Sequence, residues 1–226
     1  MPKGVNDKWM ISMTFYRFCW WLAYGLAVIL FRLRVEGRRH IPRSGALILA
    51  SNHCSYVDPV IIGVAAGREL WYLAKAELFP VPLLGKLIHR LHAMPVDRSR
   101  GDRSAFLAWT KTLQGGNPVL IFPEGTRNKR PGFLRPRSGV GMLVYRTRAP
   151  VIPVYISGTV SIWKTLVGLD RLQVRFGKPI LGCPEQLPDR RRDAYNFITR
   201  EVMHHLAVLK RMRRKAGTVA PASHNG

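Results

Sequence analysis

Three short and almost uninterrupted apolar runs constrain the fold of this chain most strongly: residues 46–50 (ALILA), 118–122 (PVLIF) and 151–157 (VIPVYIS). A strand buried on both faces reads as such a run, whereas a strand with one solvated face alternates apolar and polar residues. Helical patterns lie at 59–66, 82–94, 104–115, 139–148 and 193–215, and further strand patterns at 69–76, 94–98 and 172–177. This alternation predicts an α/β fold with a central, mostly parallel sheet flanked by helices.

The N-terminal segment from Trp9 to Phe31 has Arg17 as its only charge and holds eight of the 22 aromatic residues. The apolar part from Phe18 to Phe31, as a helix, spans about 21 Å, which is short of the roughly 30 Å hydrocarbon core. An aromatic-rich helix suits the membrane interface, and a buried core helix is the alternative. We expect a membrane-associated helix in residues 1–34, which either spans the membrane or lies in it.

The charge balance indicates an anionic partner, because 36 Lys and Arg stand against 13 Asp and Glu, a net charge of +23. Nucleic acid, acidic lipid and a phosphorylated ligand all fit this surface. The aromatic residues lie mainly in the N-terminal segment and not among the basic residues, where a nucleic-acid stacking surface needs them. Three widely spaced cysteines (Cys19, Cys54 and Cys183) indicate reduced thiols and a cytosolic setting.

The segment Asn52–Asp58 (NHCSYVD) follows the first apolar run and leads into a helix. Ser55 could cap this helix with Asp58 as its third residue, or Asp58 could cap it with Pro59 at the first helical position. Either arrangement brings the Asp58 carboxylate within reach of His53. A carboxylate on one imidazole nitrogen fixes the tautomer and leaves the other nitrogen free to accept a proton. The pair therefore predicts a general base.

A second candidate site follows the second apolar run, at residues 122–127 (FPEGTR). Proline and glycine bracket Glu124 in a tight turn, and Arg127 offers a planar, charged fork for phosphate. Seven basic residues and no acid lie between Arg127 and Arg148: Arg127, Lys129, Arg130, Arg135, Arg137, Arg146 and Arg148. The alternative for this run is a solvated basic face, and we expect it to apply to Lys129 and Arg130.

Two other readings of the reactive residues are weaker. A Cys54 nucleophile working with His53 is disfavoured because adjacent residues rarely face each other, so we expect Cys54 to be a small packing residue. His89 with His92, and the pair His204–His205, lack cysteine or carboxylate partners at ligand spacing. We therefore expect surface histidines and no metal site.

The blocks NHCSYVD, MPVDR, FPEGTRN and VIPVYISGT, in this order and spacing, resemble the 1-acyl-sn-glycerol-3-phosphate (lysophosphatidate) acyltransferases over residues 35–180. The resemblance implies that His53 and Asp58, the H-x-x-x-x-D motif, are catalytic. It also implies acceptor binding by the second and third blocks, and donor binding or site lining by the fourth. The substrate-binding residues expected on this basis are Arg98, Glu124, Gly125, Thr126, Arg127, Arg137 and Pro153. Two positions depart from the family pattern: Asn128 replaces a commoner serine, and Arg137 a usual lysine.

The resemblance implies a membrane-associated acyltransferase of phospholipid biosynthesis on the cytoplasmic face of the inner or cell membrane. It would move an acyl group from acyl-CoA or acyl-carrier protein to the sn-2 hydroxyl of lysophosphatidic acid, giving phosphatidic acid, with no cofactor and no metal. Backbone amides of the turn after His53 are candidate oxyanion donors. The alternatives are a sibling enzyme acting on another lysophospholipid or an amino-acid lipid and, from a different class, a basic nucleic-acid-binding protein. The expected organisation is a membrane-seating helix (1–34), an acyltransferase domain (35–215) and a disordered tail (216–226).

Overall fold

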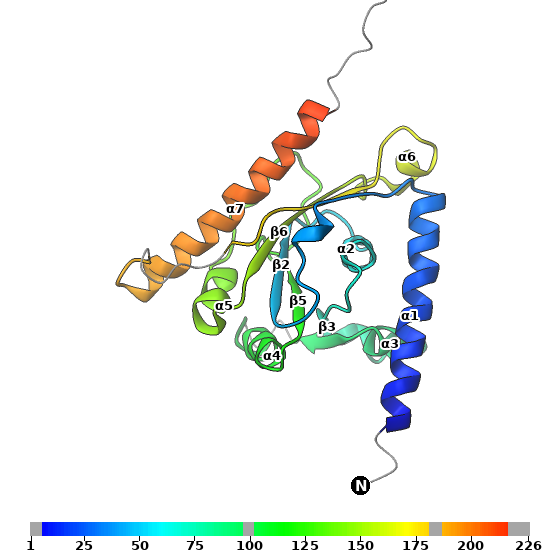
Figure 1. Cartoon of the computed structure of the whole chain (residues 1–226), viewed down its shortest axis with the longest axis horizontal. Coiled ribbons are helices and arrows are strands. Elements are labelled where there is room, and N and C mark those ends of the chain that lie inside the picture. Colours follow the sequence, from blue (N-terminus) through cyan, green and yellow to red (C-terminus); the bar gives the residue numbers. More distant parts are fainter. Residues whose placement is uncertain (1–5, 97–101, 181–186, 217–226) are drawn as a thin grey trace, which may run out of the picture.

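The computed structural model describes residues 6–96, 102–180 and 187–216, and contains a five-stranded sheet in the order β1-β7-β6-β2-β5 (Figure 1). Strands β2 (Leu47–Ser51), β5 (Pro118–Ile121) and β6 (Val151–Ser157) are parallel to one another. Strand β7 (Gln173–Phe176) is antiparallel to β6, and β1 (Arg34–Glu36) is parallel to β7. The predicted α/β fold with a mostly parallel central sheet is confirmed.

Helices cover both faces of this sheet (Figure 1). One layer contains α1 (Asn6–Ile29) and α2 (Asp58–Ala66), and the other contains α4 (Asp102–Gln114), α5 (Gly139–Thr147) and α7 (Arg191–Ala216). Along β2, Leu47 and Leu49 pack into the first layer, while Ile48 and Ala50 pack into the second. Both faces of the strand are therefore buried, which explains its uninterrupted apolar run.

Strands β3 (Tyr72–Lys75) and β4 (Ala93–Val96) form a separate parallel pair instead of extending the main sheet. Helix α3 (Leu84–Arg90) connects them, and Trp71 forms an isolated bridge to Val119 beside β5. Three short helices were not predicted from the sequence. They are the 3-10 helices η1 (Arg38–His40) and η2 (Ala76–Leu78) and the α-helix α6 (Ile162–Leu166).

Among the described side chains of α1, from residue 15 to residue 29, some pack against the domain and others are exposed. Trp20 Nε1 donates a hydrogen bond to the Gly63 carbonyl in α2, and the buried Tyr16 hydroxyl accepts one from the Leu70 amide. Tyr16 and Ala27 of α1 are buried against the domain, while Phe18 and Trp21 are exposed, so the expectation of a membrane-associated helix stays a prediction. No helix among the described residues is both long and apolar enough to cross a membrane. The tail expected at 216–226 lies outside these residues, apart from Ala216 at the end of α7.

Candidate active site

The candidate site lies where β2 and β5 end, at the carboxyl edge of the parallel strands. His53 follows β2 by two residues, and the block from Phe122 to Arg127 follows β5 directly. Ligand sites of open α/β sheets form outside the carboxyl ends of the strands, because the chain leaves the sheet there in loops. The backbone amide of Asn128 donates to the His53 carbonyl at 2.7 Å, which joins the two loops.

His53 and Asp58 form the pair that their spacing predicts. Nδ1 of His53 lies 2.9 Å from Oδ2 of Asp58. The Asp58 side chain is fully buried, whereas 16% of the His53 side chain is exposed. With Nδ1 donating to the carboxylate, the hydrogen-bond pattern assigns Nε2 as the nitrogen that accepts a proton from a substrate.

The same carboxylate oxygen anchors the turn before α2. It accepts the backbone N–H groups of Cys54, at 2.6 Å, and Ser55, at 2.7 Å. The bond to Ser55 is the backward contact of a capping box, although no side chain caps the helix, and Pro59 lies in its first turn. These two amides were candidate oxyanion donors. They are engaged with Asp58, so that expectation is wrong for both.

Two residues that sequence reasoning missed fix the position of His53. Phe122 stacks on the imidazole with ring centroids 3.9 Å apart and an interplanar angle of 16°. The buried Asn52 side chain donates to the Ile156 carbonyl at 3.0 Å and accepts the Ile156 amide at 2.9 Å. The end of β2 is thus tied to the end of β6. Asn52 is a polar residue two positions after the apolar run 46–50, next to Ser51 at the end of β2, and this polar pair was the signal that could have identified it.

The structure brings three of the expected substrate-binding residues together at the turn after β5. Glu124 is buried, and its Oε2 accepts the Leu134 amide at 2.7 Å. Gly125 has φ +69°, a backbone conformation that favours glycine, and a Cβ at this position would lie 2.7 Å from Arg137 Nε. The Arg137 amide also donates to the Pro123 carbonyl at 2.8 Å. Glu124 therefore holds the following loop, which places Arg137 against the turn.

A cationic cleft lies beside this turn. Its volume is about 430 Å³, and it is lined by Thr126, Arg127, Asn128, Lys129, Arg130 and Leu134. The Arg127 guanidinium carbon lies 3.4 Å from the centre of the Tyr56 ring, and Nη2 donates to the Tyr56 hydroxyl at 2.7 Å. Arg127 is thus held over the segment that carries His53 and Asp58. Three cations in one cleft favour an anionic group.

The substrate-binding role stays a prediction for all seven expected residues, and two of them, Pro153 and Arg98, are not placed at the turn or the cleft. Pro153 pairs with Ala50 inside the sheet, four residues before β6 ends, and a Cβ on Gly177 would contact both its ring and Leu209 of α7. It therefore lies behind the loops of the site, on the α7 side of the sheet. Arg98 lies outside the described residues.

Cys54 has the environment of a packing residue. Burial, aided by the negative charge of Asp58, raises the pKa of its thiol to about 11. A thiol with this pKa is protonated at neutral pH and is a poor nucleophile. The amide of Asn52 contacts its sulfur at 3.2 Å. This environment agrees with the expectation that Cys54 packs and does not react.

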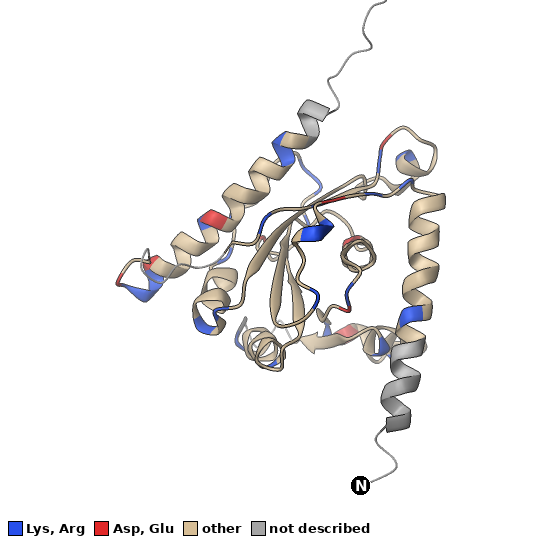
Figure 2. Cartoon of the chain, in the orientation of Figure 1, with Lys and Arg blue, Asp and Glu red and all other residues tan. Residues whose placement is uncertain are grey.

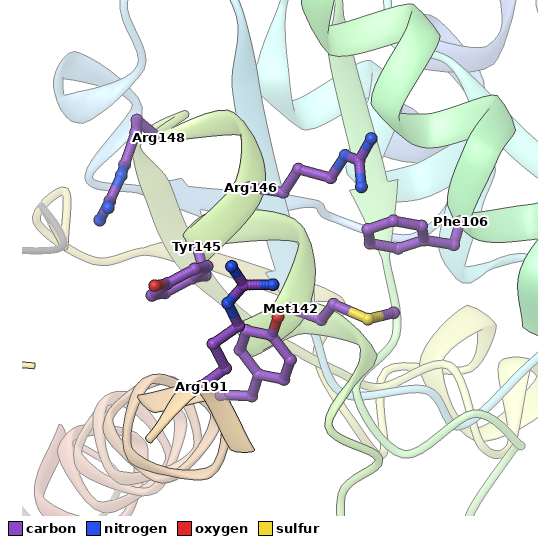
Figure 3. A pocket seen from close by; sticks show the side chains of 7 residues that line it. Phe106, Met142, Tyr145, Arg146, Arg148 and Arg191 are labelled. Atoms are coloured by element: carbon purple, nitrogen blue, oxygen red, sulfur yellow. The ribbon is translucent and has the colours of Figure 1, made fainter. Parts of the chain in front are cut away.

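The other features of the described residues that could suggest a site lie elsewhere. A second cleft, of about 390 Å³, lies among α4, α5 and α7 (Figure 3) and contains none of the expected site residues. Among the described residues, no cluster of three or more His, Cys, Asp or Glu could hold a metal ion. His92 is not the surface histidine that we expected, because its ring stacks between Tyr16 and Trp71.

Comparison with known proteins identifies the family. The family model described as Acyltransferase matches residues 32–157. The 1-acyl-sn-glycerol-3-phosphate acyltransferase of Bacillus subtilis is 30% identical over 73% of this chain and 82% of its own length. The lyso-ornithine lipid O-acyltransferase of Pseudomonas aeruginosa is 38% identical over 72% of this chain and 63% of its own length. The crystal structure of the 1-acyl-sn-glycerophosphate acyltransferase of Thermotoga maritima shares the fold, with a TM-score of 0.69, 21% identity, and coverage of 92% of this chain and 84% of that one.

Proposed function

The chain belongs to the acyltransferase family and is an O-acyltransferase, and we propose that it acylates the sn-2 hydroxyl of lysophosphatidic acid. The acyl donor is acyl-CoA or acyl-carrier protein, and the product is phosphatidic acid for phospholipid biosynthesis. One observation carries the proposal: the His53–Asp58 pair and a cleft with three cations lie at the same edge of the sheet. One acceptor could therefore place its hydroxyl at the base and its phosphate in the cleft.

The reaction is a direct acyl transfer. Nε2 of His53 takes the proton of the acceptor hydroxyl while its oxygen attacks the thioester carbonyl carbon. A C–O bond forms, the C–S bond breaks, and the proton passes from the imidazolium to the leaving thiolate. The Asp58 carboxylate, 2.9 Å from Nδ1, stabilises the imidazolium between these two proton transfers. General-base catalysis of this kind contributes about 10²–10⁴-fold.

A second acceptor headgroup is the candidate suggested by a relative named as a lyso-ornithine lipid O-acyltransferase, which is 38% identical. An ornithine headgroup carries a carboxylate that the cleft could bind, but also an ammonium group. Arg127, Lys129 and Arg130 would repel this ammonium, whereas a phosphate monoester is attracted by all three. The charges of the cleft therefore favour lysophosphatidic acid, and lyso-ornithine lipid is the second candidate.

We place the enzyme on the cytoplasmic face of the inner or cell membrane. The net charge of +23 supports this location, because each basic residue near an anionic leaflet contributes about 1 kcal/mol of attraction. The exposed aromatic residues of α1 would provide the apolar contact. The division into a membrane-seating helix (1–34) and an acyltransferase domain (35–215) belongs to the same proposal.

A panel of acceptors tests the substrate. The purified chain is incubated in detergent micelles with oleoyl-CoA or oleoyl-acyl-carrier protein and with lysophosphatidic acid, lysophosphatidylcholine or lyso-ornithine lipid, and the products are quantified by mass spectrometry. We expect kcat/KM to be at least about tenfold higher for lysophosphatidic acid, because a hydrogen bond to a charged group contributes about 1.5–3 kcal/mol. A higher kcat/KM for lyso-ornithine lipid would contradict the proposed acceptor but agree with the proposed acyl transfer. No product with any acceptor would overturn the proposed substrate class.

A further inference from the structure

The hairpin that joins β6 to β7, residues 158–172, exposes apolar side chains where a surface loop normally exposes polar ones. We call it the α6 hairpin. Trp163 is 73% exposed and Leu169 is 78% exposed. In contrast, the polar Thr165 is buried, and its hydroxyl donates to the Gly158 carbonyl at 2.6 Å. Five large apolar residues of the hairpin face solvent: Val160, Trp163, Leu166, Val167 and Leu169.

The α6 hairpin continues an apolar surface of two other elements. Figure 1 shows α6 at the carboxyl end of α1 and α3 beside the preceding part of α1, all on one side of the molecule. A Cβ on Gly168 of the hairpin would lie 3.0 Å from Arg32, just after α1, and Arg90 of α3 lies 5.2 Å from the Phe15 ring of α1. We define the apolar face by the exposed residues of the three elements: Phe18, Trp21 and Ile29 of α1, Leu83 and Leu87 at α3, and Trp163, Val167 and Leu169 of the hairpin.

The charges around the apolar face identify what covers it. Residues 15–34, 81–91 and 160–171 contain seven Lys and Arg but one acidic residue, Asp170. Figure 2 shows basic positions on α1, on α3 and on the α6 hairpin. A second copy of the chain would bring the same positive charges against these. An anionic leaflet complements both the apolar side chains and the cations, whose aliphatic stems lie along the apolar surface while their charged ends reach the headgroups.

We propose that the α6 hairpin is a second membrane-inserting element, which completes with α1 and α3 a face that lies on one leaflet of an anionic bilayer. The inference rests on the proposed function, since it takes the substrate to be a membrane lipid. Its consequence concerns the site. The hairpin follows β6, whose Ile156 is hydrogen-bonded to Asn52, the residue before His53. Insertion of the hairpin therefore holds the catalytic edge of the sheet at the lipid surface, where the acceptor hydroxyl lies.

The test compares two variants of the full chain in binding to vesicles of equal parts phosphatidylglycerol and phosphatidylcholine. One variant carries Trp163→Ser and Leu169→Ser. The control carries Leu107→Ser, which replaces an exposed leucine of α4, in the other helix layer. We expect the partition coefficient of the double variant to fall about tenfold or more, because two large apolar side chains no longer enter the lipid. The control should bind like the wild type, and all three proteins should melt at similar temperatures.

Activity gives a second measurement. The double variant should acylate lysophosphatidate embedded in vesicles less efficiently, but a short-chain, water-soluble acceptor as well as the wild type does. Unchanged vesicle binding of the double variant would overturn the inference, as would an equal loss in the Leu107→Ser control. If light scattering showed a dimer and the double substitution dissociated it, the apolar face would bind a second copy of the chain and the inference would be wrong. Vesicle binding needs no acyl acceptor, so it tests the hairpin even if the chain does not acylate lysophosphatidic acid.

Discussion

Asp58→Asn is the substitution that most sharply tests how the pair works. In the structure, Oδ2 of Asp58 accepts hydrogen bonds from His53 and from the amides of Cys54 and Ser55. Oδ1 is buried and has no hydrogen-bond partner among the described residues. The oxygen of an asparagine can therefore keep all three hydrogen bonds, while its NH₂ group takes the place of Oδ1. The substitution removes the charge but leaves the geometry.

The structure sets the size of the effect. Unit charges on the imidazolium and the carboxylate, 2.9 Å apart, interact by about 6 kcal/mol at an effective dielectric constant of about 20, which corresponds to about four orders of magnitude in rate. Asp58 acts only through His53, so its contribution cannot exceed the roughly 10²–10⁴-fold of a general base. We expect Asp58→Asn to lower kcat/KM by a factor within this range. The buried NH₂ should reduce the free energy of unfolding by about 1–3 kcal/mol.

The assay is a double-mutant cycle of acyl transfer to lysophosphatidate. It compares the wild type, Asp58→Asn, His53→Ala and the double variant, with chemical denaturation to confirm that each is folded. If Asp58 works through His53, adding Asp58→Asn to His53→Ala should cost almost nothing further. Two results would refute the reasoning: more than a tenth of wild-type kcat/KM in Asp58→Asn, or multiplicative losses in the double variant.

Substitutions at four other residues give further predictions. Arg127→Lys should raise KM for lysophosphatidic acid about tenfold in steady-state kinetics, with kcat nearly unchanged, because lysine has neither the planar fork nor the stack on Tyr56. Tyr56→Phe keeps the stack and loses only the hydroxyl, so it should raise KM less. Cys54→Ala should keep at least a third of the activity, and loss of activity would indicate that Cys54 is a nucleophile. The rate of iodoacetamide labelling of Cys54 should rise about tenfold per pH unit up to its raised pKa of about 11, since only the thiolate reacts. Glu36→Gln should lower the free energy of unfolding by about 1–3 kcal/mol in urea, because it leaves the buried Arg175 without its ion pair, 2.8 Å away; an unchanged midpoint would contradict this.

The parts of the fold that the sequence predicts well are those determined by local pattern. The run from Val151 to Ser157 is β6 to the residue, and every residue in it is buried, as an uninterrupted run predicts for a strand covered on both faces. His53 and Asp58 were predicted as a pair because they are five residues apart and a turn into a helix suffices to join them.

The rest depends on contacts that no local pattern encodes. The hydrogen bonds between Asn52 and Ile156 join residues 104 positions apart, and the stack of Phe122 on His53 depends on the neighbouring positions of β2 and β5. Helix α6 has five residues, fewer than two turns, so it shows no periodicity that could reveal it. Its apolar residues resemble those of a buried segment, and only the structure shows that they are exposed.

The central claim is that His53 is the base of an acyl transfer to lysophosphatidic acid. The most direct measurement is the formation of phosphatidic acid from lysophosphatidic acid and labelled oleoyl-CoA or oleoyl-acyl-carrier protein by the purified chain, alongside His53→Ala in the same vesicles. The account predicts product from the wild type and a loss of at least about 10²-fold in the folded variant. Equal product from both proteins would show that His53 is not the base.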